Sequence, residues 1–246
     1  MLGSANMDLV VTVDHAPGPG ETVTGRSFHS GPGGKGANQA LAAALAGAEV
    51  RFAGAVGADA YGERIRSTLA SAGVDVSALE TVAGPTGTAH ITVDRSGGNA
   101  IIVVPGANGA VRSLTGRHRE AIAAADVLLL QLELPMSVVV EAARFARAEG
   151  VSTVLTPSPV APVSDDLLDA TDMLAVNQHE AQAMTGLSDP VAAAQSLTGE
   201  KRHVLLTLGS AGVQYLRPDA APAVVPAFTV DAVDTTAAGD TFLGAF

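Results

Sequence analysis

The sequence contains no cysteine and no tryptophan, and only six phenylalanines and two tyrosines in 246 residues. Without cysteine there is no disulfide framework, no thiolate nucleophile and no cysteine-ligated zinc or iron–sulfur centre. The scarcity of aromatic rings argues against the stacking platforms that bind single-stranded nucleic acid. The chemistry of this protein must therefore come from acids, amides, hydroxyls, lysines and backbone groups.

Positive charge is scarce as well. Lysine and arginine number 14 against 25 aspartates and glutamates, which gives a formal net charge of −11. This balance disfavours nucleic acid and anionic membranes as partners, because both require a cationic surface. Asp8 interrupts any signal peptide early, and the alanine-rich run at 40–48 is far below the roughly 20 residues of a spanning helix. We therefore expect a cytoplasmic protein with small-molecule partners.

Hydrophobic residues make up 47% of the chain and charged residues 16%, which is enough for a sizeable core. Apolar segments alternate with helical patterns, as in the predicted strand Val127–Leu132, the amphipathic helix Ser137–Glu149 and the strand Ser152–Leu155. This alternation predicts an α/β fold with a mostly parallel sheet covered by helices on both faces. Further helices are predicted over 36–45 and 61–72, and further strands over 50–56, 173–176 and 203–208.

Two segments do not fit such a sheet. Residues 9–28 and 89–104 show half-exposed strand patterns around glycine-containing turns, and both are predicted to form hairpins. In the first, the strands are expected at Leu9–Val13 and Glu21–Phe28. These hairpins suggest a small accessory β-sheet that acts as a lid. No linker or repeat divides the chain, so we expect one domain over residues 1–246.

A glycine-rich region opens a predicted helix, with the sequence Gly31-Pro32-Gly33-Gly34-Lys35-Gly36-Ala37-Asn38-Gln39-Ala40. It matches neither a Walker A loop nor a dinucleotide fingerprint. Glycines allow a ligand to approach the backbone, and a helix N-terminus offers free N–H donors. A neutral polyol would suit this loop, with the amides of Asn6 and Asn38 and the carboxylate of Asp8. The alternative is an ordinary turn with Lys35 in solvent.

A second region of small residues precedes another predicted helix start, with the sequence Asp234-Thr235-Thr236-Ala237-Ala238-Gly239-Asp240-Thr241-Phe242. Successive N–H groups there can form an anion nest for a phosphate. Asp240 could accept a proton from an attacking hydroxyl. The alternative is that Asp240 is an ordinary first-turn residue favoured by the helix dipole.

A third region, Asn177-Gln178-His179-Glu180, follows the predicted strand at 173–176. An amide and a carboxylate three residues apart suit a hydrated Mg²⁺, which takes one or two carboxylates and phosphates. The same spacing suits a capping box between Asn177 and Glu180. The two readings are compatible, and spacing alone does not separate them.

Together and in this order, the three regions resemble the ribokinase family of sugar kinases, also called the phosphofructokinase-B superfamily. The resemblance extends to Pro19-Gly20-Glu21-Thr22, Gln131-Leu132-Glu133 and Thr207-Leu208-Gly209-Ser210, and covers the whole chain. It implies a three-layer ribokinase-like fold with a β-sheet lid, and transfer of the ATP γ-phosphoryl group to the 5-hydroxymethyl of D-ribose. It also implies a homodimer formed through the lid sheets.

The resemblance assigns roles residue by residue. Asp240 is the implied base, and the N–H groups of Ala237, Ala238, Gly239 and Asp240 stabilise the transferring phosphoryl. The implied sugar ligands are Asn6, Asp8, Gly34, Lys35, Asn38, Glu133 and Asp240. The implied nucleotide-site residues are Asn177, Thr207, Gly209, Ser210, Gly212 and Gly239. Asn177 and Glu180 act through Mg²⁺, partly by way of water, and Asp234 and Thr236 match positions that bind an activating K⁺.

The sequence departs from the family pattern in three places. Thr156 stands where the family commonly carries asparagine, the first strand is short, and the sequence ends at Phe246, before the last part of the family domain. Two alternatives therefore stay beside the ribose kinase. The chain could act on another sugar or a nucleoside, or it could be a truncated, inactive sugar-binding remnant.

Overall fold

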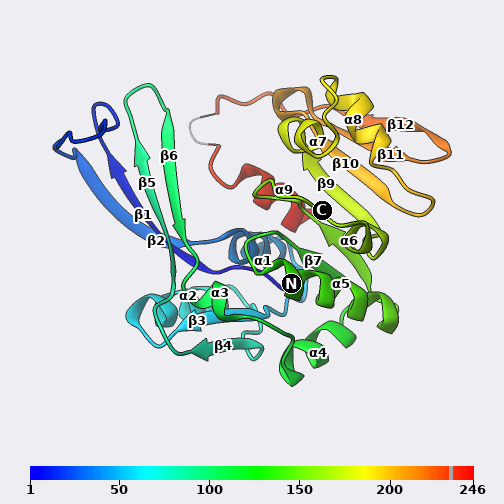
Figure 1. Ribbon diagram of the computed structural model, residues 1–246, viewed down its shortest axis with the longest axis horizontal. Coiled ribbons are helices and arrows are strands. Elements are labelled where there is room, and N and C mark those ends of the chain that lie inside the picture. Colours follow the sequence, from blue (N-terminus) through cyan, green and yellow to red (C-terminus); the bar gives the residue numbers. More distant parts are fainter. Residues whose placement is uncertain (233–234) are drawn as a thin grey trace.

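The computed structural model describes residues 1–232 and 235–246. In these residues the strands form a six-stranded sheet, a four-stranded sheet and a two-stranded pair (Figure 1). The helices are α1 (Lys35–Leu45), α2 (Ala60–Ser71), α3 (Ala107–Ala110), α4 (Gly116–Ala123), α5 (Met136–Glu149), α6 (Asp165–Asp169), α7 (Gln178–Thr185), α8 (Pro190–Ser196) and α9 (Ala238–Ala245), with a short 3-10 turn, η1, at Gly209–Ala211.

The six-stranded sheet has the order β12-β11-β10-β9-β8-β7. Its strands are β7 (Val127–Leu130), β8 (Ser152–Leu155), β9 (Met173–Asn177), β10 (His203–Thr207), β11 (Val213–Arg217) and β12 (Ala220–Val225). The first four are mutually parallel, and β11 and β12 are antiparallel additions at the edge. The predicted α/β class and mostly parallel sheet are confirmed.

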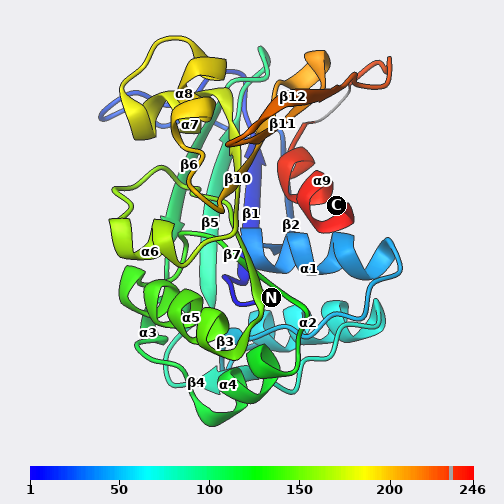
Figure 2. The same cartoon turned by 90° about the vertical axis from the view of Figure 1, so that its right-hand side faces the viewer.

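Helices α5 to α8 cover one face of this sheet, and α1 and α9 lie on the other (Figure 2). Helix α5 shows why: Val138, Val139, Ala142, Ala143 and Ala146 recur at helical spacing and are all buried against the strands. Gly150 ends the helix in the left-handed conformation with φ 74°. The strongest prediction from periodicity, the helix over 137–149, is therefore confirmed.

Residues 1–3 join the six-stranded sheet to the parallel pair β3 (Gly54–Gly57) and β4 (Leu79–Val82). The Leu2 N–H donates to Leu129 O at 3.1 Å, and the Ala53 N–H donates to Met1 O at 2.8 Å. The strand predicted over 50–56 is thus found later in the chain, as β3 at Gly54–Gly57. Its first residues, 51 and 53, make only isolated bridges.

The four-stranded sheet has the order β2-β1-β5-β6 and projects from the rest of the molecule (Figure 1). We call it the lid sheet; its strands are β1 (Asn6–Thr12), β2 (Ser27–Gly33), β5 (Gly87–Val93) and β6 (Asn99–Val104). The two hairpins are united by parallel pairing of β1 with β5. The prediction of a strand over Glu21–Phe28 is wrong. Strand β2 begins only at Ser27, so that the glycine-rich segment up to Gly33 is itself part of the strand.

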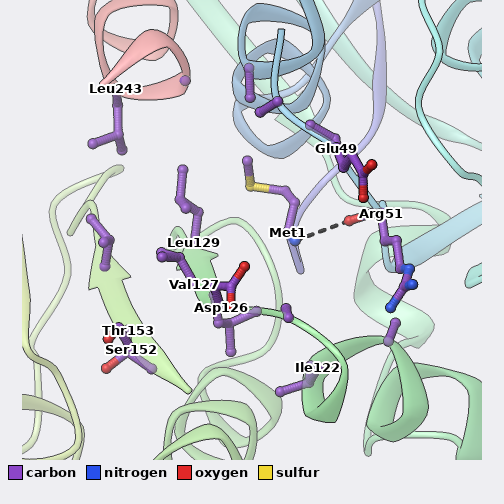
Figure 3. Close-up of a pocket in the computed structure, with 18 of the residues that line it drawn as sticks. Met1, Glu49, Arg51, Ile122, Asp126, Val127, Leu129, Ser152, Thr153 and Leu243 are labelled. Carbon is purple, nitrogen blue, oxygen red and sulfur yellow. Dashed lines mark hydrogen bonds between the residues drawn. The ribbon is translucent and has the colours of Figure 1, made fainter. Parts of the chain in front are cut away.

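The face of the six-stranded sheet that carries α1 and α9 is less completely covered than predicted. A cavity of about 990 Å³ lies there, and Figure 3 shows Leu129, Ile122, Leu243, Asp126 and Arg51 among the residues that line it. None of the described residues predicted to form the active site lines this cavity. Among the described residues, no helix has the length and apolar character needed to cross a membrane.

Candidate active site

The turn from β2 into α1 presses directly against the start of β1. Gly34 precedes α1 with φ 90°, and a Cβ built there would lie 2.8 Å from the backbone nitrogen of Asn6. A Cβ at Gly36 would lie 2.7 Å from Gly3 Cα. Only glycine fits such a close approach of two backbone segments. The glycine-rich sequence therefore serves first to bring α1 against β1, where the candidate polar residues lie.

The expectation of free N–H donors at the start of α1 is wrong. The Lys35 N–H donates to Glu133 Oε2 at 3.0 Å, the Gly36 N–H to Ser4 Oγ at 3.4 Å, and the Ala37 N–H to Ser4 O at 3.0 Å. Ser4 Oγ in turn donates to Glu133 Oε2 at 2.5 Å. Glu133 therefore caps α1 as well as facing this region, and the N–H groups of Lys35, Gly36 and Ala37 are not free for a ligand.

Two polar side chains of β1 lie beside this turn. Asn6 is buried, and its Oδ1 accepts a hydrogen bond of 2.8 Å from Asn108 Nδ2. That bond orients the Asn6 amide and leaves its NH₂ group as the donor for a ligand. Burial, reinforced by the charge of Glu133, raises the pKa of Asp8 to about 6. The predicted polyol contacts of Asn6 and Asp8 thus come from one strand of the lid sheet.

Asp240 lies in the first turn of α9, facing α1. Its Oδ1 accepts a hydrogen bond of 2.9 Å from Gln39 Nε2, and the Asn38 side chain also bonds to the carboxylate. Burial raises the pKa of Asp240, while nearby Lys35 opposes that shift. Lys35 is half-buried and lines a cavity beside Asp240, so the reading that placed it in bulk solvent is wrong. A buried carboxylate held this way can take a proton.

The segment before α9 turns sharply. Ala237 adopts the left-handed conformation with φ 56°, an unusual one for a residue with a side chain. The Ala238 N–H donates to Thr235 O at 3.2 Å, so in this structure it is not open to a phosphate as predicted. Thr236 lies in the same turn, whereas Asp234, the other predicted K⁺ ligand, falls outside the described residues.

Asn177 and Glu180 form a capping box at the start of α7. Asn177 Oδ1 accepts from the Glu180 N–H at 2.8 Å, and Glu180 Oε2 accepts from the Asn177 N–H at 2.9 Å. The capping reading of this motif is therefore confirmed. Both residues also line the cavity that Lys35 and Asp240 line. Capping engages Oε2 of Glu180, a carboxylate that is almost fully buried.

This cavity has a volume of about 660 Å³. It brings together residues from all three motif regions and from the end of β10: Lys35, Asn177, Glu180, Thr207, Gly209, Ala237, Ala238, Gly239 and Asp240. Ser210 and Gly212 do not line it. A Cβ at Gly212 would lie 2.1 Å from Val225 O, so this glycine is required for packing against β12.

The donor set fits a Mg²⁺ held mainly by a nucleotide. Within residues 1–232 and 235–246, no three His, Asp or Glu side chains cluster as a ready metal cage. Mg²⁺ in phosphoryl-transfer sites typically keeps several waters and takes one or two carboxylates plus phosphates. Glu180 and Asn177, side by side in the cavity wall, meet that requirement through water.

The geometry thus has two halves that meet at Asp240 and Lys35. On one side lie Asn6, Asp8 and Glu133, which are predicted to bind a sugar, and on the other lies the cavity with Asn177 and Glu180. A sequence profile of the pfkB family carbohydrate kinases matches residues 1–246. The chain belongs to the pfkB family of carbohydrate kinases.

Similarity to characterised pfkB kinases is strong over the whole chain. A ribokinase of Haemophilus influenzae is 41% identical over 254 residues, covering 100% of this chain and 83% of its own length. The structure of Arabidopsis thaliana ribokinase with ribose and ATP has a TM-score of 0.91 and 32% identity, covering 99% of this chain and 82% of that one. Cryptococcus neoformans ribokinase with ADP has a TM-score of 0.83 and 30% identity, covering 99% and 83%. The predicted family and fold are confirmed.

Sequence reasoning missed several polar residues of this pfkB site. Asn108 bonds to the Ala5 N–H, the Ala5 carbonyl and Asn6, and so fixes the start of β1. Ser4 and Gln131 are buried as well. Each of these residues forms hydrogen bonds with a partner far away in the sequence, and no local sequence pattern predicts such a contact. Gln39 and Gln131 lie inside motifs that carried the resemblance, but no role was assigned to them.

Proposed function

We propose that this chain catalyses the reaction of D-ribose with ATP to give D-ribose 5-phosphate and ADP. The observation that carries the proposal is the position of Asp240, which is buried against the polar side chains of α1 and lines the cavity beside α7. A base at that junction can reach a sugar hydroxyl on one side while a phosphoryl group approaches from the other. The ribokinases among its relatives support ribose as the sugar.

The sugar is held by side chains from β1, from α1 and from the segment that follows β7. The Asn6 amide donates, the Asp8 carboxylate accepts from hydroxyls, and Lys35, Asn38 and Glu133 complete the set. Gly34 contributes by bringing the start of α1 against β1, since a Cβ there would meet the backbone of Asn6. Several fixed polar groups around a polyol favour a substrate with hydroxyls in matching positions over one that lacks them.

Asp240 supplies the proton transfer. The 5-hydroxyl oxygen forms a bond to the γ-phosphorus, the bond from that phosphorus to the β,γ-bridging oxygen breaks, and the hydroxyl proton passes to the Asp240 carboxylate. ADP leaves with the bridging oxygen. Burial raises the pKa of Asp240 above the ordinary aspartate value, which makes it a stronger base, while the charge of Lys35 opposes that shift.

The nucleotide occupies the cavity of about 660 Å³, with Thr207 and Gly209 at its wall and Ser210 and Gly212 beyond them. The N–H groups from Ala237 to Asp240 turn toward the phosphates once the Ala238 bond to Thr235 opens. Mg²⁺ neutralises phosphate charge when bound, and Asn177 and Glu180 orient it through water. We propose that Asp234 and Thr236 bind K⁺. ATP as donor also supports a cytoplasmic location.

The lid sheet is proposed to join two subunits. Strand β6 lies at its edge, and Ile101, Ile102, Val103 and Val104 are all exposed, with Ile102 at 69%. An exposed apolar edge strand is a template for pairing with another chain. We infer that it pairs with the lid sheet of a second copy to form a homodimer.

A coupled ADP-release assay tests the function directly. The chain is assayed with ATP and Mg²⁺ against D-ribose, 2-deoxyribose, fructose and adenosine, with and without K⁺, and the product is identified by ³¹P NMR. We expect kcat/KM to be highest for D-ribose and K⁺ to increase it. Preference for fructose or a nucleoside would point to another kinase of the family. Ribose binding by calorimetry without turnover would identify a sugar-binding remnant.

A further inference from the structure

Behind the Asp240 carboxylate lies a row of two buried amides. Gln39 Nε2 donates to Asp240 Oδ1 at 2.9 Å, and Gln131 Nε2 donates to Gln39 Oε1 at 2.6 Å. Gln39 is 0% and Gln131 1% exposed. The row connects residues 39, 131 and 240, which come from α1, the end of β7 and α9.

We propose that Gln39, held by Gln131, is the positioning residue that fixes the Asp240 carboxylate for proton transfer. This inference rests on the proposed function, in which Asp240 is the base. The direction of each hydrogen bond in this row follows from the charge of Asp240. An ionised carboxylate only accepts, so Gln39 must turn its NH₂ toward Asp240, and its oxygen must then face the NH₂ of Gln131.

The two amides orient the Asp240 carboxylate, but they do not give the folded protein the greatest stability. Gln131 Oε1 is buried and has no hydrogen-bond partner among the described residues. A buried acceptor without a partner costs free energy, and an apolar pair of the same shape would avoid that cost. The orphaned oxygen is the consequence of turning the Gln131 NH₂ toward Gln39.

Gln39 also fixes the helix that carries Asp240. A Cβ at Gly244 of α9 would lie 2.4 Å from Gln39 O, so the backbone of Gln39 touches α9 one turn beyond its side-chain contact. Helix α9 has only eight residues, and an isolated helix of that length is marginal. Its first turn therefore depends on α1 for its position, and Gln39 makes both contacts.

The other groups around Asp240 do not replace this contact. Asn38 bonds to the same carboxylate, Lys35 attracts it and Glu133 repels it. Lys35, Asn38 and Glu133 are also proposed sugar ligands, so substrate binding engages them. Gln39 is fully buried and already bonded at both ends of its amide, which leaves it free of substrate contact. It is therefore suited to hold Asp240 in the same position with and without sugar.

The test compares Gln39→Leu, the double variant Gln39→Leu/Gln131→Leu and the control Gln195→Leu, an exposed glutamine on α8. In Gln39→Leu we expect kcat for ribose to fall by roughly 10- to 100-fold, with KM changed less than about 3-fold, because orientation is lost and sugar contacts remain. Gln195→Leu should keep wild-type kinetics. The double variant should regain thermal stability by removing the orphaned amide, but not kcat.

A titration gives a readout that needs no turnover. In protein labelled with ¹³C at aspartate carboxyls, the Asp240 signal is assigned by its loss in Asp240→Asn. Loss of the Gln39 N–H donor should raise the pKa of Asp240, because that hydrogen bond favours the ionised carboxylate. A double variant that recovers kcat together with stability, or an unchanged Asp240 titration, would leave Gln39 with a packing role only. If the wild type phosphorylates no sugar, the proposed function fails, and the titration still decides whether Gln39 holds Asp240.

Discussion

Gly33 lies directly against the carboxylate of Asp8: a Cβ built at Gly33 would fall 2.2 Å from Asp8 Oδ2 and 2.4 Å from Asp8 Cγ. A side chain at position 33 would push the carboxylate out of its place beside the sugar ligands. We expect Gly33→Ala to raise the KM for ribose by at least about 10-fold, since a hydrogen bond to a charged group contributes about 1.5–3 kcal/mol. Steady-state kinetics over a ribose series measure this.

Gly31 provides the matched control on the same strand, because a Cβ there would meet nothing within 4 Å. Gly31→Ala should leave the KM near the wild-type value. Equal KM values for the two variants would show that the Asp8 contact does not set sugar affinity.

The raised pKa of Asp8 predicts a pH dependence of sugar binding. Its carboxyl, with a pKa of about 6, is ionised above pH 6 and neutral below it. The ionised carboxylate is the stronger acceptor for ribose hydroxyls, so ribose affinity should fall as the pH drops through about 6. Calorimetric titrations from pH 5 to 8 would show the inflection in the wild type and its absence in Asp8→Asn.

The same pKa has the opposite effect on stability. The folded state holds a proton on Asp8 up to about pH 6, whereas the unfolded chain releases it near the ordinary value of 3.8. Stability from this group is therefore lost as the pH rises from about 4 to 6. Asp8→Asn should raise Tm at pH 7.5 by a few degrees, given about 2–4 °C per kcal/mol for a chain of this size. An equal change at pH 4 would contradict this origin.

Glu180 caps α7 and is proposed to orient Mg²⁺, and a substitution can separate these two roles. Glu180→Gln keeps an oxygen that accepts from the Asn177 N–H, so the capping box survives while the negative charge is lost. We expect Tm to stay within about 2 °C of the wild type, a shift worth less than about 1 kcal/mol, and the Mg²⁺ concentration for half-maximal activity to rise. Thermal unfolding and a Mg²⁺ titration of turnover measure the two effects.

Thr115 serves as the control, because it forms a capping box with His118 on α4, a helix that contributes no residue to the 660 Å³ cavity. Thr115→Ala should lower stability by about 1 kcal/mol and leave the Mg²⁺ requirement unchanged. If Glu180→Gln also left that requirement unchanged, Glu180 would be a helix cap alone.

How much of this arrangement the sequence predicts depends on the range of the interactions. Helix α5 and strand β8 follow from local periodicity, and the Asn177–Glu180 capping box from spacing of three residues. The lid sheet does not: its parallel pairing of β1 with β5 joins residues about 80 apart, and no pattern within either strand encodes that choice. The predicted start of β2 is wrong because glycine and proline usually mark turns, whereas here they continue the strand.

In the site, too, local motifs are predicted from the sequence and long-range contacts are not. Motifs indicated Asp240 and Lys35, but the partners that set their surroundings are distant. Glu133 reaches the Lys35 N–H across 98 positions, and Gln39 reaches Asp240 across 201. The sequence predicts free N–H groups at the start of α1 because the first N–H groups of a helix have no partner within the helix. Only tertiary packing brings Ser4 and Glu133 there to accept them.

The exposed edge of the lid sheet predicts an effect of Ile102 on assembly. The wild type should have twice the chain mass of 24.5 kDa in light scattering at micromolar concentration. Ile102→Lys places a charge on the 69%-exposed position of the edge strand β6 and should shift the mass to the monomer. Val224→Lys, on exposed edge strand β12 of the other sheet, should remain dimeric. A monomeric wild type, or dissociation by both variants, would count against pairing through the lid sheets.

Asp240→Asn tests the base itself. The amide keeps the size of the carboxyl and can still accept from Gln39, so the fold and the sugar contacts should persist. It cannot take the hydroxyl proton at neutral pH, and kcat should fall by roughly 10²–10⁴-fold, the usual contribution of a general base. Ribose affinity, measured by calorimetry without ATP, should change little. Because burial raises the pKa of Asp240, wild-type kcat at saturating ribose should decline on the acid side as this carboxyl is protonated, and the small remaining kcat of Asp240→Asn should lack that decline. Turnover near the wild-type rate in the variant would remove Asp240 from proton transfer and leave it as a ligand of the sugar.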